Sequence, residues 1–100
     1  MTPSISTHVL DTERGEPARG LEVELHRGDA LLSVQVTDED GRIADLVRGP
    51  LVPGTYRLVV RLRTPFFSRV DIEFAVRDAD RHYHVPLLVA PYACTTYRGS

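Results

Sequence analysis

Val70-Asp71-Ile72-Glu73-Phe74-Ala75-Val76-Arg77 is the stretch that decides the fold, because large apolar side chains recur at every second position. This spacing puts them on one face of an extended strand. The same spacing recurs in residues 21–26, 32–36 and 56–62, and in the second of these the expected core face carries Leu32, Val34 and Val36. Each of the four stretches is predicted to be a half-buried antiparallel strand.

Turn sequences separate these strands at short, regular intervals. They are rich in Gly, Pro and Asp, and they occupy residues 14–17, 27–29, 38–41 and 52–55. Short strands at such spacing are typical of a sandwich or barrel rather than of a fold that alternates strands and helices. We expect an all-β fold, a two-sheet antiparallel sandwich without a helix, formed by residues 1–100 as a single domain.

The composition restricts the partners and the compartment of the chain. With 100 residues and a formal net charge of -2, the chain has no electrostatic footprint for nucleic acid or a membrane surface. No apolar run approaches the roughly 18 residues that span a bilayer, and the first residues lack the pattern of a signal peptide. The single cysteine, Cys94, cannot form an internal disulfide. We therefore expect no nucleic-acid or membrane partner and a cytoplasmic location.

Two further stretches carry apolar side chains on both faces. In residues 82–89 one face has Tyr83, Val85, Leu87 and Val89, and the other has His82, His84, Pro86 and Leu88. Residues 6–11 likewise place His8 and Leu10 on one face. Because a sandwich buries only one face of each sheet, we expect another chain to cover the second face.

Three histidines in these two stretches are candidates for proton transfer. Histidine titrates near neutrality and is also a common metal ligand. His82 and His84 share one strand face, and His8 could supply a third nitrogen to a zinc ion. The spacing places no Asp, Glu or Cys to complete such a site, and each histidine taken alone could be an ordinary hydrogen-bonded strand residue.

Two other residues, Cys94 and Arg42, have side chains that can take part in catalysis, but their role depends on what surrounds them. Cys94 lies in a strand-like run without a neighbouring charge to activate its thiol, which favours a small packed residue over a nucleophile. Arg42 follows the turn at residues 38–41, where a guanidinium can be solvated or can point into a cleft.

Several motifs occur in an order that resembles one protein family. They are His8-Val9-Leu10-Asp11, Gly15-Glu16-Pro17-Ala18, Thr37-Asp38-Glu39-Asp40-Gly41-Arg42, His82-Tyr83-His84-Val85-Pro86-Leu87-Leu88, Pro91-Tyr92 and Tyr97-Arg98-Gly99-Ser100. This order resembles the transthyretin-like family, and residues 82–84 and 97–100 are similar to its 5-hydroxyisourate hydrolase branch rather than to vertebrate transthyretin. The resemblance implies a sandwich of the transthyretin (prealbumin-like) type.

The resemblance also implies a reaction and a site. The hydrolase branch adds water to 5-hydroxyisourate, an oxidised purine of urate breakdown, and opens its ring to 2-oxo-4-hydroxy-4-carboxy-5-ureidoimidazoline. It implies His8, Arg42, His84 and Ser100 as catalytic residues, and Arg42, Tyr97 and Ser100 as substrate-binding residues. The implied reaction needs no metal and no cofactor, because its substrate is already electrophilic. From the apolar residues on both faces of residues 82–89 we expect a homotetramer. The resemblance gives no role to His82, which we expect to be a bystander.

The alternative function is non-catalytic. Residues 9–18, 40–42 and 53–56 also resemble prealbumin-like accessory modules, and a transthyretin-like small-molecule carrier would share the same fold. The link at residues 63–68 is shorter than the helix-containing segment usual in the family. Direct assay of ring opening distinguishes a hydrolase from a carrier or an accessory module.

Overall fold

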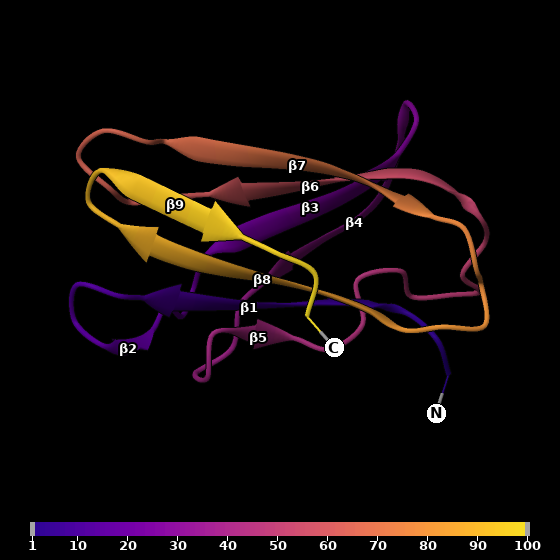
Figure 1. Cartoon of the computed structure of the whole chain (residues 1–100), viewed down its shortest axis with the longest axis horizontal. Helices are drawn as coiled ribbons and strands as arrows, with labels where there is room; N and C mark the ends of the chain where they lie inside the picture. The colour runs from indigo at the N-terminus through magenta and orange to yellow at the C-terminus, as the bar shows by residue number, and fades with distance from the viewer. Residues whose placement is uncertain (1, 100) are drawn as a thin grey trace.

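The computed structural model describes residues 2–99, which form two β-sheets (Figure 1). Sheet B has the strand order β4 (Ala30–Val36), β3 (Glu22–Arg27), β6 (Gly54–Arg61) and β7 (Arg69–Val76). Sheet A has the order β2 (Glu16–Pro17), β1 (Ile5–Asp11), β8 (Tyr83–Ala90) and β9 (Ala93–Thr96), and β5 (Arg42–Ile43) also pairs with β1. The expected all-β sandwich is confirmed. Residues 2–99 contain no helix, and so none that could cross a membrane.

Strands β1 and β8, at the centre of sheet A, pair in parallel and depart from the antiparallel pattern of the other ladders within residues 2–99. Their register puts Ser6 opposite His84, and His8 opposite Pro86. Parallel pairing needs a long connection, and most of the chain lies between these two strands. Alternation predicts which side chains share a face but not the direction of a neighbouring strand, so this pair could not be foreseen.

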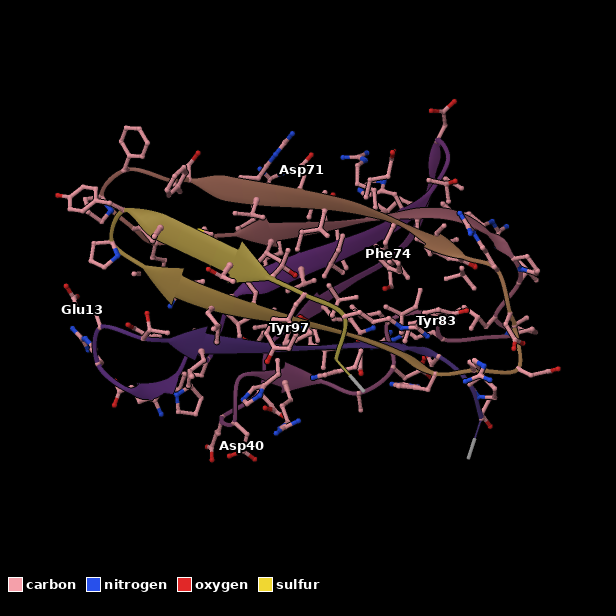
Figure 2. All side chains as sticks on the ribbon, viewed as in Figure 1. Glu13, Asp40, Asp71, Phe74, Tyr83 and Tyr97 are labelled. Carbon is pink, nitrogen blue, oxygen red and sulfur yellow. The ribbon has the colours of Figure 1, made fainter. Side chains whose placement is uncertain are left out.

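The core lies between the sheets and consists of the inward faces that the alternation predicts. The alternate residues of β8 are buried, and those of the edge strand β7 pack against the same cluster. The largest fully buried side chains include Tyr56, Ile5, Leu25, Leu58 and Leu87. Figure 2 shows the side chains of both sheets, with Asp71 on the outer side of β7 and Glu13 and Asp40 in turns at the rim.

Strand β4 differs from its expected pattern. Val34 and Val36 are 47% and 59% exposed, whereas Leu32 packs against the core. A β-bulge in the β3–β4 ladder shifts the register, and the inward position is taken by Ser33, whose hydroxyl donates to the carbonyl of Leu46. The predicted core face of β4 is therefore wrong for two of its three residues, because one extra residue inverts the alternation beyond it.

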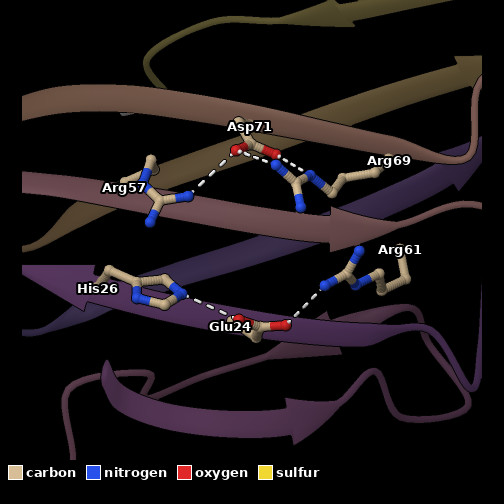
Figure 3. A network of polar contacts seen from close by, with 6 residues as sticks. All are labelled: Glu24, His26, Arg57, Arg61, Arg69 and Asp71. Atoms are coloured by element: carbon tan, nitrogen blue, oxygen red, sulfur yellow. Dashed lines mark hydrogen bonds and ion pairs between the residues drawn. The ribbon is translucent and has the colours of Figure 1, made fainter. Parts of the chain in front are cut away.

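Charged side chains cover the outer face of sheet B. Figure 3 shows two groups of polar contacts there, His26–Glu24–Arg61 and Arg57–Asp71–Arg69. Val59 of β6 lies between the two groups, opposite Glu24 of β3 and opposite Asp71 of β7. It is only 1% exposed, although it is outside the core between the sheets. The ion pairs cover the part of this face formed by β3, β6 and β7, whereas Leu31, Val34 and Val36 of the edge strand β4 are exposed on it.

Candidate active site

Strand β1 brings together three of the four predicted catalytic residues, His8, Arg42 and His84, on the outer face of sheet A. His8 lies opposite Arg42 in the ladder with β5, and Ser6 lies opposite His84 in the ladder with β8. Side chains that lie opposite each other in a ladder share a face, as do positions i and i+2 of a strand. Two histidines, one arginine and one serine therefore come together from three strands.

The turn before β5 positions Arg42. The Asp38 carboxylate accepts hydrogen bonds from the backbone N–H groups of Asp40 and Arg42, both at 2.9 Å. Gly41 has a φ of +73°, and a β-carbon at this position would collide with the carbonyl oxygen of Val9. Glycine meets both conditions because it tolerates positive φ and has no side chain. The turn thus holds the start of β5 closely against β1.

Ser6 connects two histidine side chains. Its Oγ lies 2.8 Å from Nε2 of His82 and 2.8 Å from Nδ1 of His84. The backbone N–H of Ser4 donates to Nδ1 of His82 at 3.2 Å. Because Ser6 is buried, these hydrogen bonds are shielded from competing water and fix the orientation of both imidazoles.

The environment of His84 favours its neutral form. Burial lowers the pKa of His84 from its ordinary value, and repulsion from Arg42, His8 and His82 lowers it further. A neutral imidazole has one N–H and one lone pair, so it can donate a hydrogen bond and accept a proton. The neutral ring can act as a base through a free lone pair or as a hydrogen-bond donor through its N–H.

A depression of about 240 Å³ opens beside these residues, lined by Ser6, Thr7, Arg42, Ile43, Ala44, His82 and His84. His8 neighbours Arg42 in the ladder but does not line this depression. Tyr97 lines a second depression of about 220 Å³, together with Phe74, Tyr83 and Arg98 among others. His84 lines both. The structure thus brings Arg42 and His84 to one depression, and connects Tyr97 to it only through His84.

The C-terminal tail is attached to β8. Gly99 forms an antiparallel bridge with His84, and its N–H donates to the His84 carbonyl oxygen at 2.8 Å. The Arg98 guanidinium carbon lies 4.9 Å from the centroid of the Tyr83 ring. Figure 1 shows the segment after β9 crossing β8. The tail is therefore held in place as far as Gly99, while Ser100, predicted as a catalytic and binding residue, lies outside the described residues.

Two alternative chemistries receive no support from the geometry of residues 2–99. Within that part of the chain, no group of three or more His, Cys, Asp or Glu side chains is arranged to hold a metal ion. Both ring nitrogens of His82 already have hydrogen-bonding partners. Cys94 packs partly against the core, where burial raises the pKa of its thiol, so it is a packed residue rather than an activated nucleophile.

Sequence reasoning missed Ser6, which joins His82 and His84 of the motif at residues 82–88. The available signal was its position, two residues before His8 and hence on the same face of the strand. Serine is common on strand surfaces, so this signal has little weight until the parallel register places Ser6 opposite His84.

The known proteins that are similar to this chain point to one family. The profile of the HIUase/Transthyretin family matches residues 5–99. The chain is 45% identical to 5-hydroxyisourate hydrolase 2 of Rhizobium meliloti (strain 1021), over 96% of this chain and 95% of that protein. The solved structure of Klebsiella pneumoniae 5-hydroxyisourate hydrolase has a TM-score of 0.89 and 39% identity, covering 97% of this chain and 99% of that one.

The fold is also that of sea bream transthyretin, solved in complex with thyroxine. The TM-score is 0.84 at 24% identity, over 95% of this chain and 93% of that chain, which shows a shared fold and no more. The family profile and the two hydrolase relatives cover almost the whole sequence, in agreement with the order of motifs along it. This chain belongs to the HIUase/Transthyretin family.

Proposed function

We propose that this chain hydrolyses 5-hydroxyisourate in urate degradation, and that the outer face of sheet A is its active site. Relatives at 45% and 39% identity carry the name of this hydrolase. The observation that carries the proposal is the convergence of Arg42 and His84 on one depression, with His8 beside Arg42 in the adjoining ladder.

The reaction adds water to a ring carbonyl and breaks the neighbouring carbon–nitrogen bond. The water oxygen bonds to the carbonyl carbon, one water proton passes to a base, and the departing nitrogen takes up a proton. Arg42 is suited to stabilise the negative charge on the carbonyl oxygen, and His8 and His84 are suited to move protons. Each contribution is worth about a hundredfold or more. Because the substrate is already electrophilic, the proposal requires no metal and no cofactor.

We extend the proposal to a homotetramer whose dimers meet through the face bearing His84 and Leu88. Leu10 and Leu88 lie opposite each other next to the site and are half-buried, while Tyr92 is 71% exposed in the β8–β9 turn. A second copy on this face would remove these apolar groups from water and cover the exposed Arg42. Sedimentation that found a fully active monomer would contradict this assembly. The cytoplasmic location stays a prediction.

The activity is tested by mixing the purified chain with freshly generated 5-hydroxyisourate and following its disappearance. We expect a rate above the spontaneous one that increases in proportion to protein concentration. Arg42→Ala should reduce that rate strongly, whereas Arg57→Ala, on the outer face of sheet B, should not. A small-molecule carrier would bind the compound without accelerating its loss, and an accessory module would do neither.

A further inference from the structure

A chain of hydrogen bonds connects His82 to His84, which lines the active-site depression. It runs from the Ser4 N–H to Nδ1 of His82, from Nε2 of His82 to Oγ of Ser6, and from Oγ of Ser6 to Nδ1 of His84. The heavy-atom distances are 3.2, 2.8 and 2.8 Å. Ser4 and Ser6 are 5% and 9% exposed, so the chain of bonds is largely shielded from solvent.

The first hydrogen bond determines the direction of the others. A backbone N–H can only donate, so Nδ1 of His82 must accept, and the proton of the neutral His82 ring is on Nε2. That N–H then donates to Ser6, which leaves the single hydroxyl proton of Ser6 for Nδ1 of His84. If Nδ1 of His84 were the protonated nitrogen, Ser6 would accept twice and its own buried proton would have no acceptor in this chain of bonds.

We propose that His82 is a positioning residue, which acts through Ser6 to fix the neutral His84 ring as the tautomer with its proton on Nε2. The lowered pKa of His84 favours the neutral ring on which this arrangement depends. His84 then presents an N–H donor, rather than a lone pair, on the nitrogen not bonded to Ser6. A neutral histidine used as a hydrogen-bond donor can stabilise a developing oxyanion.

This arrangement divides the roles of the two catalytic histidines. With Nδ1 occupied by Ser6 and Nε2 protonated, neutral His84 has no free lone pair with which to take a proton from water. Within residues 2–99, no side-chain hydrogen bond holds the His8 ring, so no described residue engages its lone pair. His8 is then the base, and His84 joins Arg42 in stabilising the oxyanion.

The outer end of the chain of bonds is anchored by Asp45. The Ser4 hydroxyl donates to the Asp45 carboxylate, which also accepts the backbone N–H of Arg48 at 3.0 Å. The hydrogen bond from Ser4, followed by that from Arg48, lowers the pKa of Asp45, so the carboxylate stays ionised at neutral pH. Ser4 is thereby held where its N–H meets the His82 ring. The resemblance gives His82 no role, and no local pattern predicts these contacts, because they come from residues far away along the chain.

The tautomer is tested without substrate, by ¹⁵N NMR of the histidine rings in the full chain near neutral pH. We expect Nδ1 of His84 to show the chemical shift of an unprotonated nitrogen and Nε2 that of a protonated one. Ser6→Ala should convert this to a mixture of tautomers, whereas Ser6→Thr, which keeps the hydroxyl, should preserve it. A proton on Nδ1 in the parent chain, or an unchanged spectrum in Ser6→Ala, would overturn the proposal.

The kinetic consequence rests on the proposed function and is measured separately. Ser6→Ala and His82→Ala should each lower kcat by about tenfold, and the double variant should be no worse than either, because both act through one chain of bonds. Ser33→Ala, which removes an equally buried serine hydroxyl in sheet B, should leave kcat unchanged. Losses that multiply in the double variant, or no loss in either single variant, would count against the proposal. A chain without hydrolase activity would refute the function while the NMR result still tested the tautomer.

Discussion

A β-carbon on Gly99 would lie 2.5 Å from Cδ2 of the His84 ring and 3.2 Å from its Cβ. Carbon atoms that are not bonded to each other prefer separations of about 3.5–4.0 Å, so a larger residue cannot pass the imidazole at this point without displacing it. Because Gly99 has no side chain, the tail can pass the His84 ring without displacing it. This explains in physical terms why glycine occupies position 99.

Gly99→Ala should lower turnover by about tenfold or more, because the new methyl group displaces the His84 ring from its contact with Ser6. The melting temperature should change little, since no core residue is altered. Gly49→Ala is the matched control, because a β-carbon there meets no atom within 4 Å. Full turnover in Gly99→Ala would show that the ring tolerates displacement and that the contact has no functional importance.

Deleting residues 99 and 100 should abolish most of the activity with little effect on the melting temperature. The deletion removes the hydrogen bond from the Gly99 N–H to the His84 carbonyl but few apolar contacts. Activity assays and thermal denaturation of the same preparation separate these two effects. A chain extended by a C-terminal tag should behave similarly, and a tagged chain with undiminished turnover would argue against a role for the tail.

The pKa of His84 should lie below that of an ordinary histidine. Burial first, and then Arg42, His8 and His82, lower its pKa below the ordinary value of 6.5. Between the lowered pKa and 6.5 the unfolded chain binds more protons than the folded one, so the contribution of this group to the free energy of unfolding decreases as the pH falls through that window. Below the lowered pKa the loss is complete.

NMR titration of the His84 ring measures this shift directly. Arg42→Gln should move the pKa back towards 6.5 by removing one of the charges that lower it. Arg57→Gln, an equivalent change on sheet B, should leave it where it is. A His84 pKa at or above 6.5 in the parent chain would contradict the account of its environment.

Treatment with a chelator should not change the ring-opening rate. His82 is engaged by Ser4 and Ser6, and Nδ1 of His84 by Ser6, so the three-histidine zinc site would have to break these hydrogen bonds to form. The assay compares dialysed protein before and after chelation, and again after zinc is added. Loss of activity on chelation with recovery on zinc would favour the metal site.

The sequence predicted which side chains face the core better than it predicted how the strands pair. The alternation in β7 and β8 identified their core-facing residues, and the motif order identified the family. Alternation failed at β4, where a bulge moved Val34 and Val36 into solvent. A bulge depends on cross-strand pairing, which periodicity does not record.

The resemblance names candidate site residues but not their arrangement. Arg42 and His84, both among these candidates, line one depression, whereas the resemblance gives no role to Ser6 or His82. The hydrogen bonds that join Ser6 to both histidines depend on the parallel pairing of β1 with β8, which unites two ends of the chain. Long-range pairing of this kind leaves no local signal in either strand.

The central claim, that the outer face of sheet A carries the hydrolysis, is tested most directly by comparing three histidine variants in one assay. His8→Ala and His84→Ala should each reduce turnover of freshly generated 5-hydroxyisourate by about a hundredfold or more while the fold survives. His26→Ala is the control, because His26 is a half-buried strand histidine that contacts Glu24 on the outer face of sheet B. We predict full turnover in His26→Ala. Undiminished turnover in His84→Ala, or an equal loss in His26→Ala at matched stability, would contradict the account.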